Sequence, residues 1–222
     1  MNREIALIIS GFLFWFIIAT NIASGRFGYR TIDEITPEAK LQEIKNSPQK
    51  FKTGVFLILI EHTSIIVLAA ILFIAFSSYN VVLALIWLIS RTAEGLIQIY
   101  YKRFYWGLLS LARQYMGTRS GNSKELLDRA STILKTKSVS FSVAQILFSI
   151  GTLAYSILFV AYGVLPLFIG WLGIIAGFLY GLGNWLTPLN PKFKFILYPG
   201  ALLVLVFEAI LGGWLIFAHI AV

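Results

Sequence analysis

Four charged residues stand inside long apolar stretches of this sequence and are its main candidates for chemistry. They are Glu61, Arg91, Glu94 and Glu208. A charged side chain inside a membrane span costs about 2.5 to 3.5 kcal/mol on insertion scales, so each needs a partner or a wet cavity. Carboxylates beside a guanidinium suit an ion pair, the binding of a cation or proton, or general acid–base catalysis.

Counting residues from the basic ends of the apolar stretches places these four charges at a similar depth. At 1.5 Å per helical residue, all four lie about 10 to 15 Å from the basic side. Arg91, Glu94 and Gln98 follow an i, i+3, i+7 spacing and therefore share one helix face. We expect a ligand-binding or ion-pair cluster with these members: Glu61, His62, Arg91, Glu94, Gln98 and Glu208.

Three interpretations of this cluster stay open. Arg91 is a structural partner of Glu208 or Glu61, with the remaining acids neutral because burial disfavours a charged carboxylate. Alternatively, the residues bind a ligand or ion, and their excess negative charge favours a cation, a proton or a headgroup amine. The third interpretation is a catalytic centre. A metal site is not predicted, because His62 points about 100° away from Glu61 on a helix.

The composition of the chain excludes a soluble globular protein. Of its 222 residues, 58% are hydrophobic and 13% are charged, whereas soluble domains are about half apolar and about 25% charged. We therefore predict an all-α polytopic membrane protein, a bundle of six transmembrane helices in a single domain over residues 1–222. A span needs about 20 apolar residues. The predicted spans are residues 5–24, 54–76, 81–101, 139–161, 168–186 and 198–219.

Basic residues are concentrated on one side of the predicted bundle. The chain has 18 Lys and Arg against 10 Asp and Glu, and 16 of the 18 lie in residues 26–52, residues 102–137 and the loop with Lys192 and Lys194. By the positive-inside rule these segments face the cytoplasm and both termini face outward.

Two of the basic segments, residues 26–52 and 102–137, also carry an amphipathic helical pattern. In the second, Leu126, Ala130 and Leu134 recur at helical spacing among lysines and arginines. We expect both helices on the membrane surface, where the basic side chains attract anionic lipid headgroups. Nothing in this pattern indicates a nucleic-acid partner.

Small residues in the fifth predicted span indicate close helix packing. Gly173, Gly177 and Gly181 stand four residues apart, which lets a second backbone approach. The neighbour is either internal, which we favour, or a second copy or a partner in a membrane complex. The chain has no cysteine, and no metalloprotease, nucleophile-elbow or phosphate-loop motif, so no cofactor is predicted.

The C-terminal third carries motifs that resemble a known family. They are the stretch from Leu165 to Gly173, Ala176 to Tyr180, Tyr198-Pro199, and a last helix with Glu208 before Gly213-Trp214-Leu215. These motifs, with an arginine in the third span, are similar to the bacterial membrane family called domain of unknown function 4386. The resemblance covers most of the chain. It implies a multi-pass protein of the bacterial cytoplasmic membrane and supplies no activity.

Three functions therefore remain open. The first is binding or transport of a small solute, lipid or proton through the polar cluster. The second is a structural or assembly subunit of a membrane complex, which would use the glycines and the basic segments. The third, less favoured, is an intramembrane lipid-modifying enzyme in which a carboxylate acts as general base and Arg91 holds an anion.

Overall fold

The protein is built from helices, six of them long and apolar enough to cross a membrane. A computed structural model describes residues 2–29, 35–115 and 123–217, and within these ranges there is no strand. This confirms the predicted all-α class and the six spans. The elements are α1 Arg3–Arg26, α2 Pro37–Asn46, α3 Pro48–Phe76, α4 Val81–Trp106, α5 Leu108–Tyr115, α6 Ser123–Tyr162, α7 Leu167–Leu186, the 3-10 turn η1 Pro191–Phe193 and α8 Lys194–Phe217.

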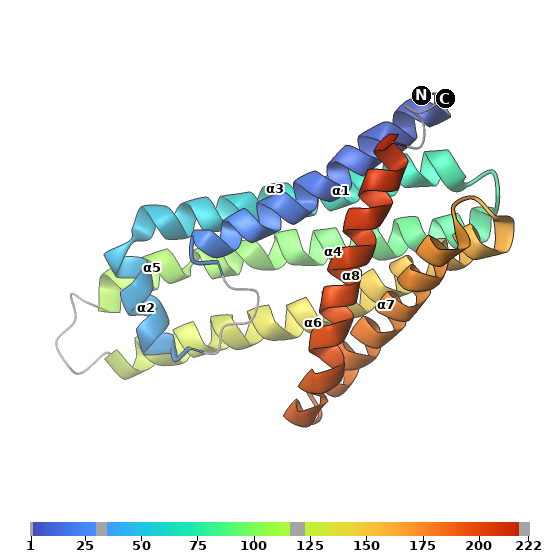
Figure 1. Cartoon of the computed structure of the whole chain (residues 1–222). Coiled ribbons are helices and arrows are strands. Elements are labelled where there is room, and N and C mark those ends of the chain that lie inside the picture. Colours follow the sequence, from blue (N-terminus) through green and yellow to red (C-terminus); the bar gives the residue numbers. More distant parts are fainter. Residues whose placement is uncertain (1, 30–34, 116–122, 218–222) are drawn as a thin grey trace.

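The six long helices form a closed ring of neighbours. In order around the ring, α1 packs on α3, α3 on α4, α4 on α6, α6 on α7, α7 on α8, and α8 on α1. The N-terminal end of α1 and the C-terminal end of α8 lie at the same end of the molecule, and α7 and α8 run obliquely to α3, α4 and α6 (Figure 1). A polar residue on the inner face of any of these helices is therefore directed toward a common interior.

Short turns set the order of the ring. The α3–α4 turn ends at Asn80, whose side-chain oxygen accepts a hydrogen bond of 3.0 Å from the backbone N–H of Leu83. This caps the first turn of α4. The α6–α7 turn passes through Gly163, which has a φ of 59°. That left-handed conformation is open to glycine at little cost, so both connections reverse the chain within a few residues.

Helix α6 differs from the prediction of a surface helix followed by a separate span at residues 139–161. It is one continuous helix of 40 residues, about 60 Å long against a hydrocarbon layer of about 30 Å. No proline or glycine interrupts residues 123–150, so nothing ends the helix at the membrane boundary. Helix α4 likewise continues beyond residue 101 to Trp106.

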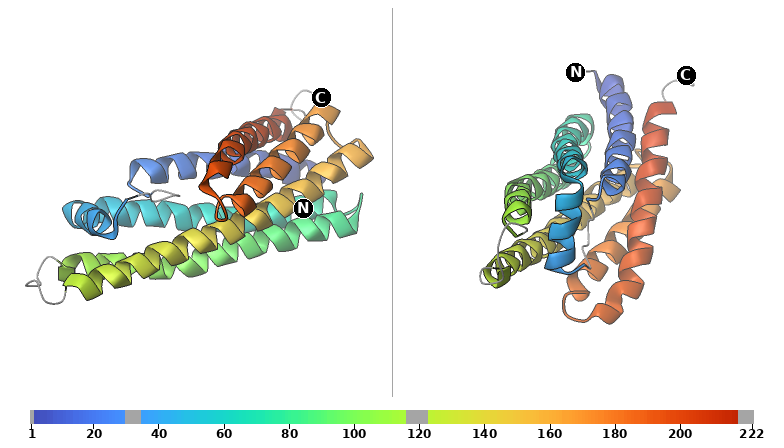
Figure 2. Two further views of the ribbon diagram at one scale, coloured as in Figure 1. Left: turned by 90° about the horizontal axis from the view of Figure 1, so that it is seen from below. Right: turned by 90° about the vertical axis from the view of Figure 1, so that its left-hand side faces the viewer.

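A second hydrophobic core lies on the basic side, outside the ring. It is formed by α2, α5 and the adjoining ends of α3, α4 and α6, which we call the basic-side cap (Figure 2). Leu41 and Ile44 of α2 are buried there with Leu126 and Ala130 of α6. The apolar faces that we expected on the membrane surface are thus covered by protein, while Lys45, Lys124, Arg129 and Lys135 stay exposed.

Glycines allow the helices of the ring to approach closely. Gly173, Gly177 and Gly181 of α7 lie against α6, where a Cβ on Gly181 would stand 2.8 Å from Cβ of Ser149. The glycine face is therefore occupied by an internal neighbour. Gly11 of α1 and Gly212 of α8 meet in the same way, and a Cβ on Gly11 would stand 2.6 Å from the carbonyl oxygen of Gly212.

Two glycines of α8 give a matched test of this packing. A Cβ on Gly200 would lie 2.7 Å from the backbone nitrogen of Tyr180, whereas one on Gly213 would meet only a Trp15 ring carbon at 3.4 Å. We expect Gly200→Ala to lower the free energy of unfolding by about 1 to 3 kcal/mol, because backbone cannot move aside. Gly213→Ala should change it by less than about 0.5 kcal/mol. Thermal unfolding in detergent, followed by circular dichroism, measures both, and equal melting temperatures would contradict the packing.

Candidate functional site

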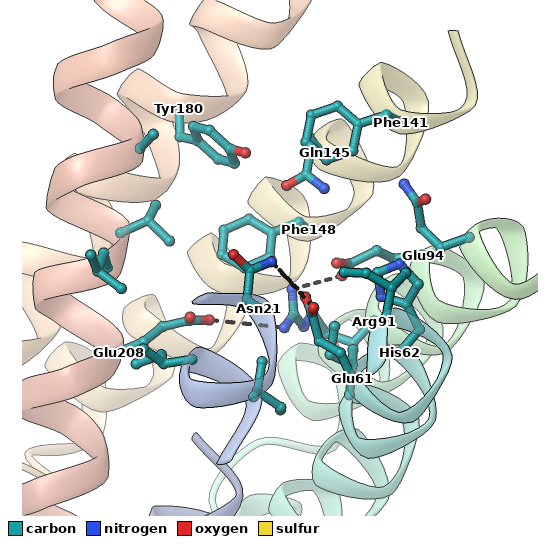
Figure 3. Close-up of a pocket in the computed structure, with 18 of the residues that line it drawn as sticks. Asn21, Glu61, His62, Arg91, Glu94, Phe141, Gln145, Phe148, Tyr180 and Glu208 are labelled. Atoms are coloured by element: carbon teal, nitrogen blue, oxygen red, sulfur yellow. Dashed lines mark hydrogen bonds and ion pairs between the residues drawn. The ribbon is translucent and has the colours of Figure 1, made fainter. Parts of the chain in front are cut away.

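Arg91 lies at the centre of the ring and is only 1% exposed. Its Nη1 donates a hydrogen bond of 2.6 Å to Oε2 of Glu94, one turn along α4. Its Nη2 lies 3.9 Å from Oε1 of Glu208 on α8. The guanidinium carbon also stands 4.3 Å from the centre of the Phe148 ring. Two acids from different helices and an aromatic face thus hold one buried cation (Figure 3).

The space for the arginine side chain is provided by a glycine. A Cβ added to Gly151 of α6 would lie 3.1 Å from Cγ of Arg91. A larger residue at this position would press on the arginine stem. Helices α4 and α6 therefore pack closely beside the stem of Arg91. The guanidinium extends beyond this contact toward Glu94 and Glu208.

Glu61 is held by a residue of the first span. The side-chain nitrogen of Asn21 donates to both carboxylate oxygens of Glu61, at 3.1 and 3.2 Å. Asn21 is an exposed residue of α1 that also lines the cavity, whereas Glu61 is buried on α3. This contact was missed at the sequence level because an amide carries no charge. The available signal was a lone asparagine in an otherwise apolar span.

All six residues predicted for the cluster line one cavity of about 320 Å³. Ligand pockets commonly have volumes of about 300 to 1,000 Å³. Every one of the six spans contributes to the wall, as does Tyr29 after α1. The polar lining consists of Asn21, Tyr29, Glu61, His62, Arg91, Glu94, Gln98, Gln145, Tyr180 and Glu208. Asn184, another polar span residue, instead donates to the carbonyl of Tyr180 at 2.9 Å.

Several buried polar atoms of the cavity wall are without a hydrogen-bond partner in the described part of the chain. They are Nδ1 of His62, Nε of Arg91 and Nε2 of Gln98. Buried polar groups in proteins are almost always hydrogen-bonded, so these three nitrogens are exceptions among the described residues. These atoms lie on α3 and α4, beside the acids of the cluster.

Two lysines, Lys102 and Lys137, are buried near the same cavity. From the sequence, both are predicted to lie in basic segments at the membrane surface. Nζ of Lys102 donates a 2.7 Å hydrogen bond to Oε1 of Gln98 and stands 5.2 Å from the Tyr29 ring. Nζ of Lys137 stands 4.7 Å from the rings of both Tyr29 and Tyr105. Both lysines are buried because α4 and α6 continue into the basic-side cap. Lys102 could have been found from the sequence, because it stands four residues after Gln98 and so shares its helix face.

Acidic side chains outnumber basic ones on the cavity wall. Three carboxyl groups and one guanidinium are among the described lining residues, and the buried Lys102 and Lys137 lie close by. Within the ranges the structure describes, no group of His, Cys, Asp and Glu is arranged to hold a metal ion. The arrangement is suited to accepting hydrogen bonds from a positively charged group.

Comparison with known proteins gives a family and no activity. A family model described as Domain of unknown function (DUF4386) matches residues 9–218. No curated protein matches the chain, and no solved structure matches it. The match agrees with the resemblance found in the C-terminal third of the sequence.

Two arginine variants separate the buried charge cluster from an exposed ion pair. Arg91→Gln leaves the neighbouring acids without their cation, so we expect it to lower the free energy of unfolding by about 3 to 5 kcal/mol. Arg129 pairs with Glu125 at 2.7 Å on the surface, where both side chains are 64% exposed. Arg129→Gln should cost at most about 1 kcal/mol. Thermal unfolding in detergent compares the two, and similar losses would argue against a buried cluster.

Proposed function

The chain belongs to the DUF4386 family, and from its site we propose that it binds a small ligand with a positively charged group inside the membrane. The observation that carries this proposal is the convergence of Glu61, Glu94 and Glu208 with a single arginine on one cavity. A cation placed among these carboxylates offsets their excess charge, and in an apolar surrounding such a contact is strong.

The cluster is more than a closed ion pair. Glu94 is in direct contact with Arg91, but Glu208 is 3.9 Å from it, which is beyond hydrogen-bonding distance. Among the described residues, Glu61 accepts its hydrogen bonds from the neutral Asn21. Two of the three carboxylates therefore have acceptor capacity left for a ligand, and both line the cavity.

The orientation of the protein follows from its basic cap. We propose that the basic-side cap faces the cytoplasm, because Lys and Arg accumulate on the cytoplasmic side of membrane proteins. The exposed lysines and arginines of the cap then lie beside anionic headgroups and attract them. In this orientation the acids of the cavity lie in the cytoplasmic half of the bundle.

The alternative role as an assembly subunit receives less support. The glycine face of α7, which would serve a partner helix, is covered by α6 within the same chain. The apolar faces of α2 and of the first turns of α6 are covered by each other. The cavity is thus the feature that favours one function over another.

Binding of a simple cation tests the proposal. We expect butylamine, a short cation at neutral pH, to raise the melting temperature of the purified protein in detergent, since a ligand that binds only the folded state stabilises it. Butyrate at the same ionic strength should not. With Glu208→Gln, we expect about tenfold more butylamine to be needed for the same rise in melting temperature.

The matched control is Glu125→Gln, which removes an acid from the exposed surface of α6. This variant should respond to butylamine as the wild type does. Equal stabilisation by butyrate and butylamine, or an unchanged response in Glu208→Gln, would overturn the proposed cation site.

A further inference from the structure

The cavity opens sideways between α1 and α8. At one end these helices are locked together, because Gly11 meets Gly212 and the indole N–H of Trp15 donates a 3.0 Å hydrogen bond to the carbonyl of Ala209. From this contact α1 and α8 diverge toward the basic side (Figure 1). The cavity lies in the fork that they form, with residues 17–22 of α1 and 201–208 of α8 among its walls.

The rim of this opening is exposed on the outer surface of the bundle. Ile22 of α1 is 54% exposed and Leu205 of α8 is 42% exposed, and both also line the cavity. Both residues stand within the apolar spans. A surface at this position faces the bilayer, so the opening leads from the lipid rather than from water.

The walls change in character from the rim to the interior. The exposed Ile22 and Leu205 and the half-buried Ile18 make the outer part mostly apolar, beside the exposed Asn21. The buried Arg91 and its acids form the inner end. In Figure 3, Glu208 and Glu61 face Arg91 from different helices. A ligand that matches both parts has a charged head and an alkyl chain.

From this geometry, and resting on the cation site proposed above, we infer that the ligand is an amphiphile with a primary ammonium head. It enters from the bilayer between α1 and α8, places its head between Glu61 and Glu208, and leaves its alkyl chain at the rim. A primary ammonium has three N–H donors. Among the residues that the structure describes, Glu61 accepts hydrogen bonds from the amide of Asn21, and Glu208 lies 3.9 Å from the Arg91 guanidinium without a hydrogen bond to it. A quaternary ammonium has no N–H donor.

The same head group occurs in two sources, single-chain amines and the headgroup of phosphatidylethanolamine. Both present a primary ammonium beside an apolar chain. The cavity chemistry is common to both, so the lipid of the nanodisc is varied to separate them.

The absence of cysteine from the chain allows a site-directed block of the opening. Leu205→Cys, labelled with a bulky maleimide, places the label at the rim. Leu202→Cys carries the same label one turn away on α8, at a residue that is 61% exposed and is not part of the cavity wall. Binding of dodecylamine is measured for both in nanodiscs of phosphatidylcholine, together with the unlabelled variants as controls for folding.

We expect the label at residue 205 to weaken dodecylamine binding by about tenfold relative to the label at residue 202. Butylamine, which is too short to reach the rim, should bind both labelled proteins alike. Dodecyltrimethylammonium should bind at least about tenfold more weakly than dodecylamine to the unlabelled protein.

Equal dodecylamine binding by the two labelled proteins would overturn the placement of the alkyl chain between α1 and α8. Equal binding of dodecyltrimethylammonium would overturn the requirement for a primary ammonium. If butylamine still binds after either of these outcomes, the proposed cation site is retained and only the amphiphile inference fails. If butylamine binds none of the proteins, the proposed cation site itself is wrong. In nanodiscs of phosphatidylethanolamine, weaker dodecylamine binding assigns the lipid headgroup as the ligand, and unchanged binding assigns a single-chain amine.

Discussion

A guanidinium cannot be left unpaired in a bilayer, and the arrangement of this protein depends on how Arg91 is accommodated. The cost of an unpaired buried charge is several kcal/mol, so the acids that face it must be held in place by the fold. Glu94 is supplied by the same helix and Glu208 by the last one. Because these two helices are not neighbours in the ring, the whole ring must close before Arg91 has both partners. The charge cluster and the helix order therefore depend on each other.

Close packing around the ring keeps this interior small while leaving one side open. Gly151 makes room for the stem of Arg91, and Gly181 brings α7 onto α6. Gly11 and Gly212 join α1 to α8 at one end only, so the two helices separate toward the basic side. The basic-side cap then fixes the far ends of α3, α4 and α6 through a core of its own. The cavity lies where α1 and α8 have separated, with Asn21 of α1 and Glu208 of α8 both in its wall.

Much of the site could be predicted from the sequence because helical geometry is regular. The spacing of Arg91, Glu94 and Gln98 gave a shared face, and counting from the basic ends placed Glu61 and Glu208 at the same depth. Asn21 was not found because it carries no charge, and Lys102 was not found because α4 was expected to end at the membrane boundary. The order of helices in the ring was also hidden, since lipid-facing and protein-facing surfaces are equally apolar. The charges alone indicated a cavity, but its shape and its other wall residues depend on that order and could not be predicted.

Arg91 and the acids around it act as one charge cluster, and a double-mutant cycle tests this most directly. Arg91→Met and Glu94→Met are made singly and together, and the free energy of unfolding is measured in detergent. We expect the double variant to be more stable than Arg91→Met alone, with a coupling energy of about 1 to 3 kcal/mol, because it removes the carboxylate that the first change leaves unpaired. Additive losses, with a coupling below about 0.5 kcal/mol, would contradict the pairing of Arg91 with Glu94.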